Sequence, residues 1–411
     1  MNLLIRIATG TLLTISAATS FAAAAEGPAP PHWVASWQAS PQPVWGADFL
    51  FPTGIPQALT HQTFRQTGRI SLGGSRLRVR LSNAYGTTPL RIGAASVAGS
   101  AGASPVALSF DGQPGTLIAS GQDRLSDPLA LPTRDRQAVQ VDVYIPGPAP
   151  LQTFHWEGRQ TSAIAPGNQT GRAALHDSTT TTARLFLTGI EVEAPAAART
   201  VVVIGDSITD GATASLDRDQ RWTDHLAARL ASQGMAVVNA GISGGRLLRD
   251  GMGESALARF QRDALDQPGV ASVVVLVGIN DISWPGTAFA RDQPQPSLAD
   301  LQAGYRQLIE RAHAQGVRIV GATLTPFAGA LPGTSLSDYY RPDKDALRRQ
   351  LNAWLRDEAP FDAVIDFDAA LRDPADPARL APRFDSGDHL HPGDAGNRAM
   401  AEAVDLAVFG Q

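Results

Sequence analysis

The chain has 411 residues, of which 43% are hydrophobic and 18% are charged, as in ordinary globular proteins. Its 34 Lys and Arg stand against 39 Asp and Glu, for a net charge of −5, and it has no basic run, which argues against nucleic-acid binding. The sequence has no cysteine, which excludes disulfides, a catalytic thiol and thiolate metal sites.

The N-terminus has the three parts of a secretory signal peptide. Residues 1–6 carry a positive charge, residues 7–21 are mostly apolar or small, and residues 22–25 are alanines. The apolar part is too short for a membrane span, and no later stretch reaches the roughly 18 apolar residues that a span needs. A buried N-terminal helix would not explain the Pro-rich residues 26–31 that follow. We therefore predict a signal peptide over residues 1–25 and a secreted or periplasmic protein.

Residues 26–195 are expected to form an antiparallel β-sandwich domain. Val139, Val141 and Val143 alternate with polar residues, and similar short runs recur between Gly, Pro, Asn and Asp. Such alternation is typical of half-buried strands. Residues 193–198, mostly Ala with one Pro, are interpreted as a linker. Because this linker is short, we expect the β-sandwich to pack against the rest of the chain and to help shape a cleft there.

Residues 196–411 have the pattern of an α/β domain. Apolar runs of strand length at 201–204, 273–277 and 317–320 alternate with segments in which apolar residues recur every three or four positions, as over residues 301–309. Fully apolar strands between helices predict a parallel sheet that is covered on both faces. In such a sheet, functional residues lie in the loops at the carboxyl ends of the strands.

Four loops of this second half contain residues that are suited to catalysis. Three follow predicted strands: 205–211 (GDSITDG), 239–245 (NAGISGG) and 278–281 (GIND). The fourth, 388–393 (DHLHPG), precedes the last predicted helix. A serine after a buried strand can present its hydroxyl to a cleft, and an asparagine amide can donate to an oxyanion. A histidine oriented by a carboxylate can take the serine proton near neutral pH.

Each of these loops also has a simpler interpretation. A Ser or Asp in the first loop could cap a helix, the glycines of 239–245 could form an ordinary turn, and Asn280 could cap another turn. Asp388, His389 and His391 could bind zinc, but three ligands within four residues would require a very unusual loop. The glycine spacing of 239–245 does not fit a dinucleotide-binding fingerprint. The ordered combination of four motifs is therefore more specific than any one of them.

In this order, the four motifs resemble those of the SGNH hydrolase superfamily, also called the GDSL family, with Ile208 in place of the leucine of the name. The resemblance covers about residues 200–411 and implies a three-layer, flavodoxin-like parallel sheet. It implies that Ser207 is the nucleophile, that His391 is the general base, and that Asp388 orients His391.

The same resemblance implies an oxyanion hole. Its donors would be the N–H groups of Ser207 and Gly244 and the amide of Asn280. Gly241 and Gly245 are adjacent candidates for the place of Gly244. Because these donors come from the backbone and an amide side chain, the chemistry requires no metal and no organic cofactor.

The implied activity is hydrolysis of carboxylic esters through an acyl-enzyme. A signal peptide, a β-domain and this hydrolase domain together are also similar to a secreted subgroup related to xylanase-associated acylhydrolases. We therefore expect short-acyl, mainly acetyl, esters of a polysaccharide or another small ester as substrates. An arylesterase or lysophospholipase is the alternative, as is an inactive carbohydrate-binding relic in which Trp33, Trp37 and Trp45 stack on sugars.

Overall fold

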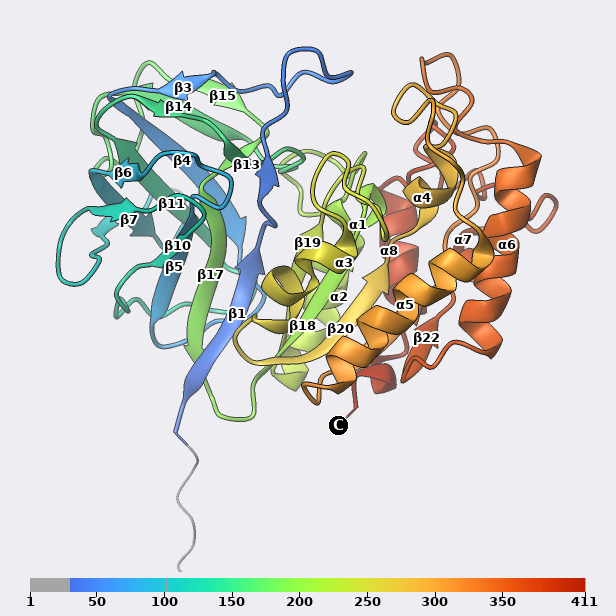
Figure 1. Ribbon diagram of the computed structural model, residues 1–411. Coiled ribbons are helices and arrows are strands. Elements are labelled where there is room, and N and C mark those ends of the chain that lie inside the picture. The colour runs from blue at the N-terminus through green and yellow to red at the C-terminus, as the bar shows by residue number, and fades with distance from the viewer. Residues whose placement is uncertain (1–29, 101, 411) are drawn as a thin grey trace, which may run out of the picture.

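The computed structural model describes residues 30–100 and 102–410 (Figure 1). The predicted signal peptide over residues 1–25 lies outside the described residues. None of the helices in the described ranges is both long and apolar enough to cross a membrane.

The first half of the described chain consists of antiparallel sheets. A four-stranded sheet has the order β1-β17-β5-β10, and a six-stranded sheet has the order β15-β14-β4-β11-β7-β8. The four strands of the first sheet are β1 (His32–Gln38), β5 (Leu77–Ser82), β10 (Asp123–Leu125) and β17 (Leu187–Ala194). The six strands of the second sheet are β4 (Gln62–Arg69), β7 (Ala94–Ala98), β8 (Val106–Ala107), β11 (Ala138–Ile145), β14 (Ser162–Pro166) and β15 (Thr179–Thr181).

Three small sheets complete this half. The first joins β2 (Gln42–Pro43), β13 (Thr153–His155) and β16 (Arg184–Leu185). The other two pair β3 (Ala58–Leu59) with β12 (Ala149–Pro150), and β6 (Leu90–Ile92) with β9 (Thr116–Ile118). The alternating valines Val139, Val141 and Val143 lie on β11 and are fully buried in the core of this half. The antiparallel β-sandwich predicted from this alternation is confirmed.

The second half is a parallel sheet between helices, as predicted (Figure 1). Its strand order β19-β18-β20-β21-β22 places the first strand of the chain second in the sheet, which is the flavodoxin-like order. The strands are β18 (Arg199–Gly205), β19 (Met235–Gly241), β20 (Val270–Leu276), β21 (Arg318–Ala322) and β22 (Ala363–Ile365). The last of them was not among the predicted strands, because its three apolar residues make too short a run to be recognised as a strand.

Helices cover both faces of this sheet, with α2 packed against α8 and α5 packed against α6. The α-helices are α1 (Ser207–Asp210), α2 (Trp222–Leu230), α3 (Ala256–Phe260), α4 (Ile279–Ser283), α5 (Leu298–His313), α6 (Pro342–Asp357), α7 (Phe367–Leu371) and α8 (Asp394–Ala403). Shorter turns of other helix types span Ala231–Gln233, Gln261–Leu265 and Leu406–Phe409.

The connection between the two halves is shorter than predicted. Glu193 and Ala194 are the last two residues of β17, because they continue its pairing with β1, so only residues 195–198 connect β17 to β18. Buried apolar side chains form two clusters, one drawn almost entirely from residues 34–194 and the other, apart from Ala35, from residues 201–409. On this basis we propose that the two domains, 26–195 and 196–411, meet at this connection.

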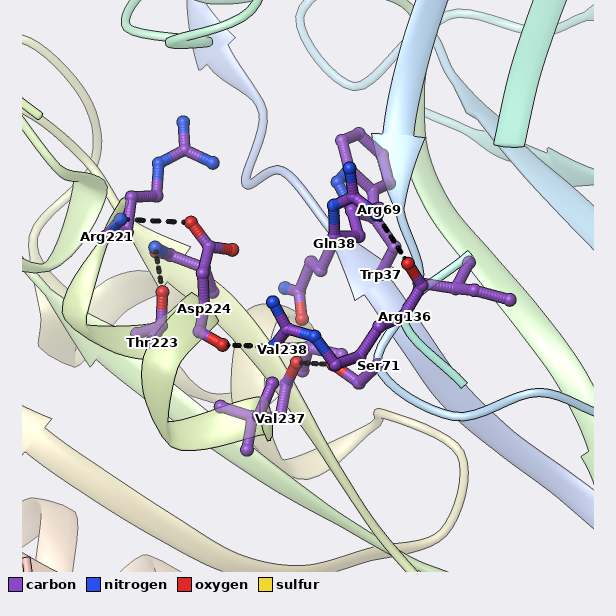
Figure 2. A pocket seen from close by; sticks show the side chains of 13 residues that line it. Trp37, Gln38, Arg69, Ser71, Arg136, Arg221, Thr223, Asp224, Val237 and Val238 are labelled. Atoms are coloured by element: carbon purple, nitrogen blue, oxygen red, sulfur yellow. Dashed lines mark hydrogen bonds between the residues drawn. The ribbon is translucent and has the colours of Figure 1, made fainter. Parts of the chain in front are cut away.

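The two halves are packed against each other along β1. The N–H of Ala35 donates to the carbonyl of Pro268 at 2.9 Å, and the Thr200 hydroxyl donates to the carbonyl of Ala35 at 3.2 Å. A cavity of about 30 Å³ lies in this interface, where Arg136 of the β half donates to the carbonyl of Asp224 at 2.6 Å (Figure 2). The cavity has room for about one water molecule.

Candidate active site

The four predicted loops meet at the carboxyl edge of the parallel sheet. Parallel strands place their carboxyl ends at one edge, so loops that are far apart in sequence become neighbours in space. There the five predicted site residues line one pocket of about 430 Å³: Ser207, Gly244, Asn280, Asp388 and His391.

Ser207, His391 and Asp388 form a continuous hydrogen-bonded series. His391 Nε2 lies 2.8 Å from Ser207 Oγ, and His391 Nδ1 lies 2.6 Å from Asp388 Oδ2. The second carboxylate oxygen, Asp388 Oδ1, accepts the backbone N–H groups of Leu390 at 2.9 Å and of His391 at 2.8 Å. One oxygen of the Asp388 carboxylate is thereby bonded to the imidazole, and the other is fixed by the backbone.

The charge of Asp388 determines which nitrogen of His391 donates a hydrogen bond and which accepts one. Burial by itself would raise the pKa of Asp388, but the bonds from His391 and the two backbone N–H groups hold that pKa well below its usual range. The group is therefore an ionised carboxylate that accepts the Nδ1–H of His391. Nε2 is then the acceptor nitrogen, and it can take the proton of the Ser207 hydroxyl.

Ser207 is the first residue of α1 and is separated from the end of β18 by Asp206 alone. The helix cap is Asp206, whose Oδ1 accepts the N–H of Ile208 at 3.0 Å. Capping therefore occupies Asp206 and leaves the Ser207 hydroxyl for His391. Burial raises the pKa of Asp206 to about 7. Within the described ranges, no acceptor is bonded to the Ser207 N–H, which belongs to the first turn of the helix.

Among the three glycines considered for the second loop, the geometry singles out Gly244. The N–H of Gly241 donates to Asn239 Oδ1 and that of Gly245 donates to the carbonyl of Ile242, both at 2.8 Å. In the part of the chain that the structure describes, the N–H of Gly244 has no such acceptor, and Gly244 lines the pocket. Its φ of +73° is a conformation that favours glycine, and an added Cβ would press on Met252.

Asn280 lies at the start of α4 and is held in one orientation. Its Nδ2 donates to the carbonyl of Gly245 at 2.9 Å, and its Oδ1 accepts the hydroxyl of Tyr339 at 2.7 Å. Because a carbonyl can only accept, these partners identify which end of the amide is nitrogen. The second N–H of Nδ2 is left for a ligand in the pocket.

Two supporting residues were missed in the sequence. Tyr339 carries no motif and reaches Asn280 from 59 positions away, so no local pattern could have identified it. Asp281 is part of the GIND motif, and its carboxylate accepts the backbone N–H groups of Leu247 at 2.6 Å and Leu248 at 2.9 Å. Burial raises the pKa of Asp281 to about 6. Asp281 thereby anchors the segment that follows Gly245.

His389 lies outside the series. Its Nδ1 is paired with the carboxylate of Asp385, and His389 does not line the pocket. Across residues 30–100 and 102–410, no group of three or more His, Asp or Glu is arranged to hold a metal ion.

The β half supplies part of one wall of the pocket, as the sequence led us to expect. Phe51 and Trp156 from the β half, with Trp284 and Phe289 from the α/β half, form what we call the aromatic wall. Phe51 stacks on Trp156 with ring centroids 5.6 Å apart, Trp284 stacks on Phe289 at 4.3 Å, and Phe51 meets Phe289 at 5.5 Å. The wall therefore bridges both halves.

Residues 203–399 match the family model of the GDSL-like lipase/acylhydrolase family. This segment is a GDSL-like acylhydrolase domain. The match begins within β18 and covers the other four strands of the parallel sheet and all four loops of the site. The activity of the domain is that of a carboxylic ester hydrolase. A comparison with curated proteins found no match.

Two solved structures illustrate the similarity of the GDSL-like domain to known folds. An acetylxylan esterase from Geobacillus stearothermophilus is 24% identical, with 52% of this chain and 94% of that chain covered and a TM-score of 0.38. A GDSL-like lipase from Bacteroides thetaiotaomicron is 19% identical, with 51% of this chain and 87% of that chain covered and a TM-score of 0.37.

Proposed function

We propose that this chain is an exported serine esterase in which Ser207 is the nucleophile, His391 the general base and Asp388 the residue that orients the base. The observation that carries the proposal is the uninterrupted series from Asp388 Oδ2 through His391 to Ser207 Oγ, with spacings of 2.6 and 2.8 Å. These are hydrogen-bond distances, and the series ends in the pocket.

The reaction follows from the direction of the series. As Ser207 Oγ attacks the ester carbonyl carbon, His391 Nε2 takes its proton, and the carbonyl oxygen becomes an oxyanion. His391 then returns the proton to the alcohol oxygen as the C–O bond breaks, which leaves an acyl-enzyme on Ser207. Water, deprotonated by His391, attacks the acyl carbon. His391 then returns this proton to Ser207 Oγ as the bond between the acyl carbon and Oγ breaks, which releases the acid and the free serine.

The oxyanion would be bound by the N–H groups of Ser207 and Gly244 and by Nδ2 of Asn280. Supporting this, all three residues line the pocket, and the two backbone N–H groups have no acceptor within the described ranges. Donors that are already in place at the developing charge stabilise the transition state without reorganisation.

For the substrate, we propose short-acyl, mainly acetyl, esters of a polysaccharide or another small ester. The predicted signal peptide and the β half support this choice. The pocket of about 430 Å³ is much larger than an acetyl group, so it has room for part of the alcohol as well.

One observation favours the alternative, an arylesterase. The aromatic wall presents stacked rings beside the nucleophile, and an aromatic alcohol group would pack on them. Phenyl acetate and 2-naphthyl acetate distinguish the two, because their leaving groups have similar acidity and differ in ring area. An arylesterase favours the naphthyl ester in kcat/KM and loses this preference in Trp156→Ala, whereas a sugar deacetylase favours acetylated xylo-oligosaccharides over both.

The test of the catalytic assignment uses p-nitrophenyl acetate. Ser207→Ala and His391→Ala should each lower kcat by about 10⁴–10⁶-fold, as in other serine hydrolases. His389→Ala is the matched control, since this neighbouring histidine is bonded to Asp385 and not to Ser207. Turnover by a folded Ser207→Ala protein would disprove the nucleophile, and equal losses at the two histidines would disprove the assignment of the base.

A further inference from the structure

Three buried polar side chains connect the β half to the turn that carries Gly244. His155, at the end of β13, is 5% exposed, Asp210, at the end of α1, is 1% exposed, and Ser243 is 4% exposed. His155 Nε2 lies 3.0 Å from Asp210 Oδ1. Asp210 Oδ2 in turn accepts the backbone N–H of Ser243 at 2.9 Å and its hydroxyl at 3.0 Å.

Both nitrogens of the His155 ring form hydrogen bonds, and their partners determine where the ring carries its protons. Nδ1 lies 3.0 Å from the carbonyl of Ser40, and because a carbonyl only accepts, Nδ1 carries a proton and donates to it. The hydrogen bond between Nε2 and Asp210 Oδ1 contains one further proton. Either location of that proton leaves Asp210 bonded to the β half on one oxygen and to Ser243 on the other.

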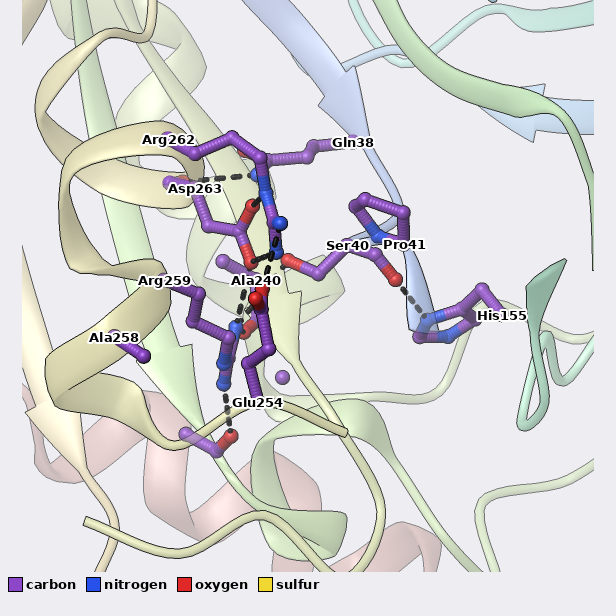
Figure 3. Close-up of polar contacts among 12 residues, drawn as sticks. Gln38, Ser40, Pro41, His155, Ala240, Glu254, Ala258, Arg259, Arg262 and Asp263 are labelled. Carbon is purple, nitrogen blue, oxygen red and sulfur yellow. Dashed lines mark hydrogen bonds and ion pairs between the residues drawn. The ribbon is translucent and has the colours of Figure 1, made fainter. Parts of the chain in front are cut away.

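Ser40, whose carbonyl bonds His155, is itself firmly held (Figure 3). Arg259, which is 1% exposed, donates to Ser40 Oγ at 3.3 Å, to the carbonyl of Ala240 at 2.6 Å and to the carbonyl of Gly205 at 3.0 Å. Ala240 and Gly205 lie at the carboxyl ends of β19 and β18, just before the two loops of the site. His155 is therefore anchored to the same frame as the catalytic loops.

We infer that His155 is a positioning residue for the esterase reaction, which orients the Gly244 N–H toward the oxyanion through Asp210 and Ser243. Gly244 has no side chain, and its N–H has no acceptor within the described ranges, so its direction depends on the residue before it. That residue, Ser243, is held by its two bonds to Asp210. A donor that is displaced from the oxyanion loses transition-state stabilisation while the pocket still binds the ester. The inference rests on the proposed function.

The test compares His155→Gln with His155→Asn, because each amide replaces one ring nitrogen. A glutamine amide reaches the place of Nε2 and keeps the bond to Asp210, whereas an asparagine amide reaches only the place of Nδ1 and keeps the bond to Ser40. Each variant loses one buried bond. On p-nitrophenyl acetate, we expect His155→Asn to lower kcat about tenfold or more with KM changed less than about twofold. His155→Gln should keep kcat within about threefold of the wild type.

Two controls accompany the pair. His61→Asn changes another histidine of the β half, which bonds Tyr144 at 2.7 Å and not Asp210. The kcat of this variant should be unchanged. Ser207→Ala is assayed alongside. If Ser207→Ala stays active, the proposed function fails, and if it is inactive while His155→Gln and His155→Asn have equal kcat, only the positioning role fails.

Folding of each variant is measured by thermal unfolding. If His155→Asn is unfolded at the assay temperature, Ser243→Ala decides, because it removes one of the two bonds to Asp210 without changing the interface. A fall in kcat of at least about threefold at constant KM supports the positioning role of the hydrogen bonds that link His155, Asp210 and Ser243. Unchanged kcat in Ser243→Ala, or a loss that appears only in KM, overturns it.

Discussion

Replacing Tyr339 by Phe removes one hydroxyl and tests how the Asn280 amide is held. The hydroxyl donates to Asn280 Oδ1 at 2.7 Å, and burial raises the pKa of Tyr339 well above its ordinary value, so it remains a donor at every assay pH. Asn280 is only 3% exposed, so its oxygen would be left without a donor. Such a loss costs about 1–3 kcal/mol in stability.

Tyr339→Phe should lower kcat less than removal of the Asn280 amide does. Asn280→Ala deletes an oxyanion donor and should lower kcat by about 10²–10³-fold. Tyr339→Phe leaves the bond from Nδ2 to the Gly245 carbonyl, so we expect a loss of about 1–2 kcal/mol in transition-state stabilisation. This corresponds to a fall in kcat of roughly 5- to 30-fold.

The assay is a double-mutant cycle on p-nitrophenyl acetate. Once Asn280 is alanine, Tyr339→Phe should change kcat by less than about twofold, because the hydroxyl acts only through the amide. Tyr340→Phe is the matched control, since this neighbouring tyrosine packs on Phe327 with ring centroids 5.2 Å apart. Full kcat in Tyr339→Phe, or equal losses with and without Asn280, would refute the reasoning.

Two further predictions concern stability and the β half. Burial raises the pKa of Asp206 from 3.8 to about 7, so the stability due to its bound proton is complete below pH 3.8 and is lost as the pH rises to 7. Between pH 5 and 8, urea unfolding should show the wild type losing about 3 kcal/mol more than Asp206→Asn, which retains the capping oxygen, and equal losses would contradict the burial argument. A fragment of residues 199–411 lacks one side of the aromatic wall and the bond from His155, and should be poorly soluble or weakly active on p-nitrophenyl acetate. A stable, fully active fragment would instead identify the β half as a targeting module.

Much of the fold was predictable because its signals are local. The apolar run 201–204 marks a strand covered on both faces, and it became the middle of β18. Alternation at Val139, Val141 and Val143 marks a strand of an antiparallel sheet, here β11. The short strand β22 gave no such signal, and the end of β17 was mistaken for a linker because Ala and Pro dominate the residues after it.

By itself, the sequence placed three of the four loops of the site, since a motif directly after a parallel strand must lie at the carboxyl edge of the sheet. The fourth loop, residues 388–393, precedes α8 and was assigned to the site only through the family resemblance. Only the tertiary structure decided which groups support those loops. Gly244 stands out among three glycines once the partners of the other N–H groups are known. Tyr339 and His155 reach the site from a distant loop and from the other half of the chain, so their contacts depend on how whole elements pack. No spacing along the chain encodes such contacts, because they form only when the elements fold together.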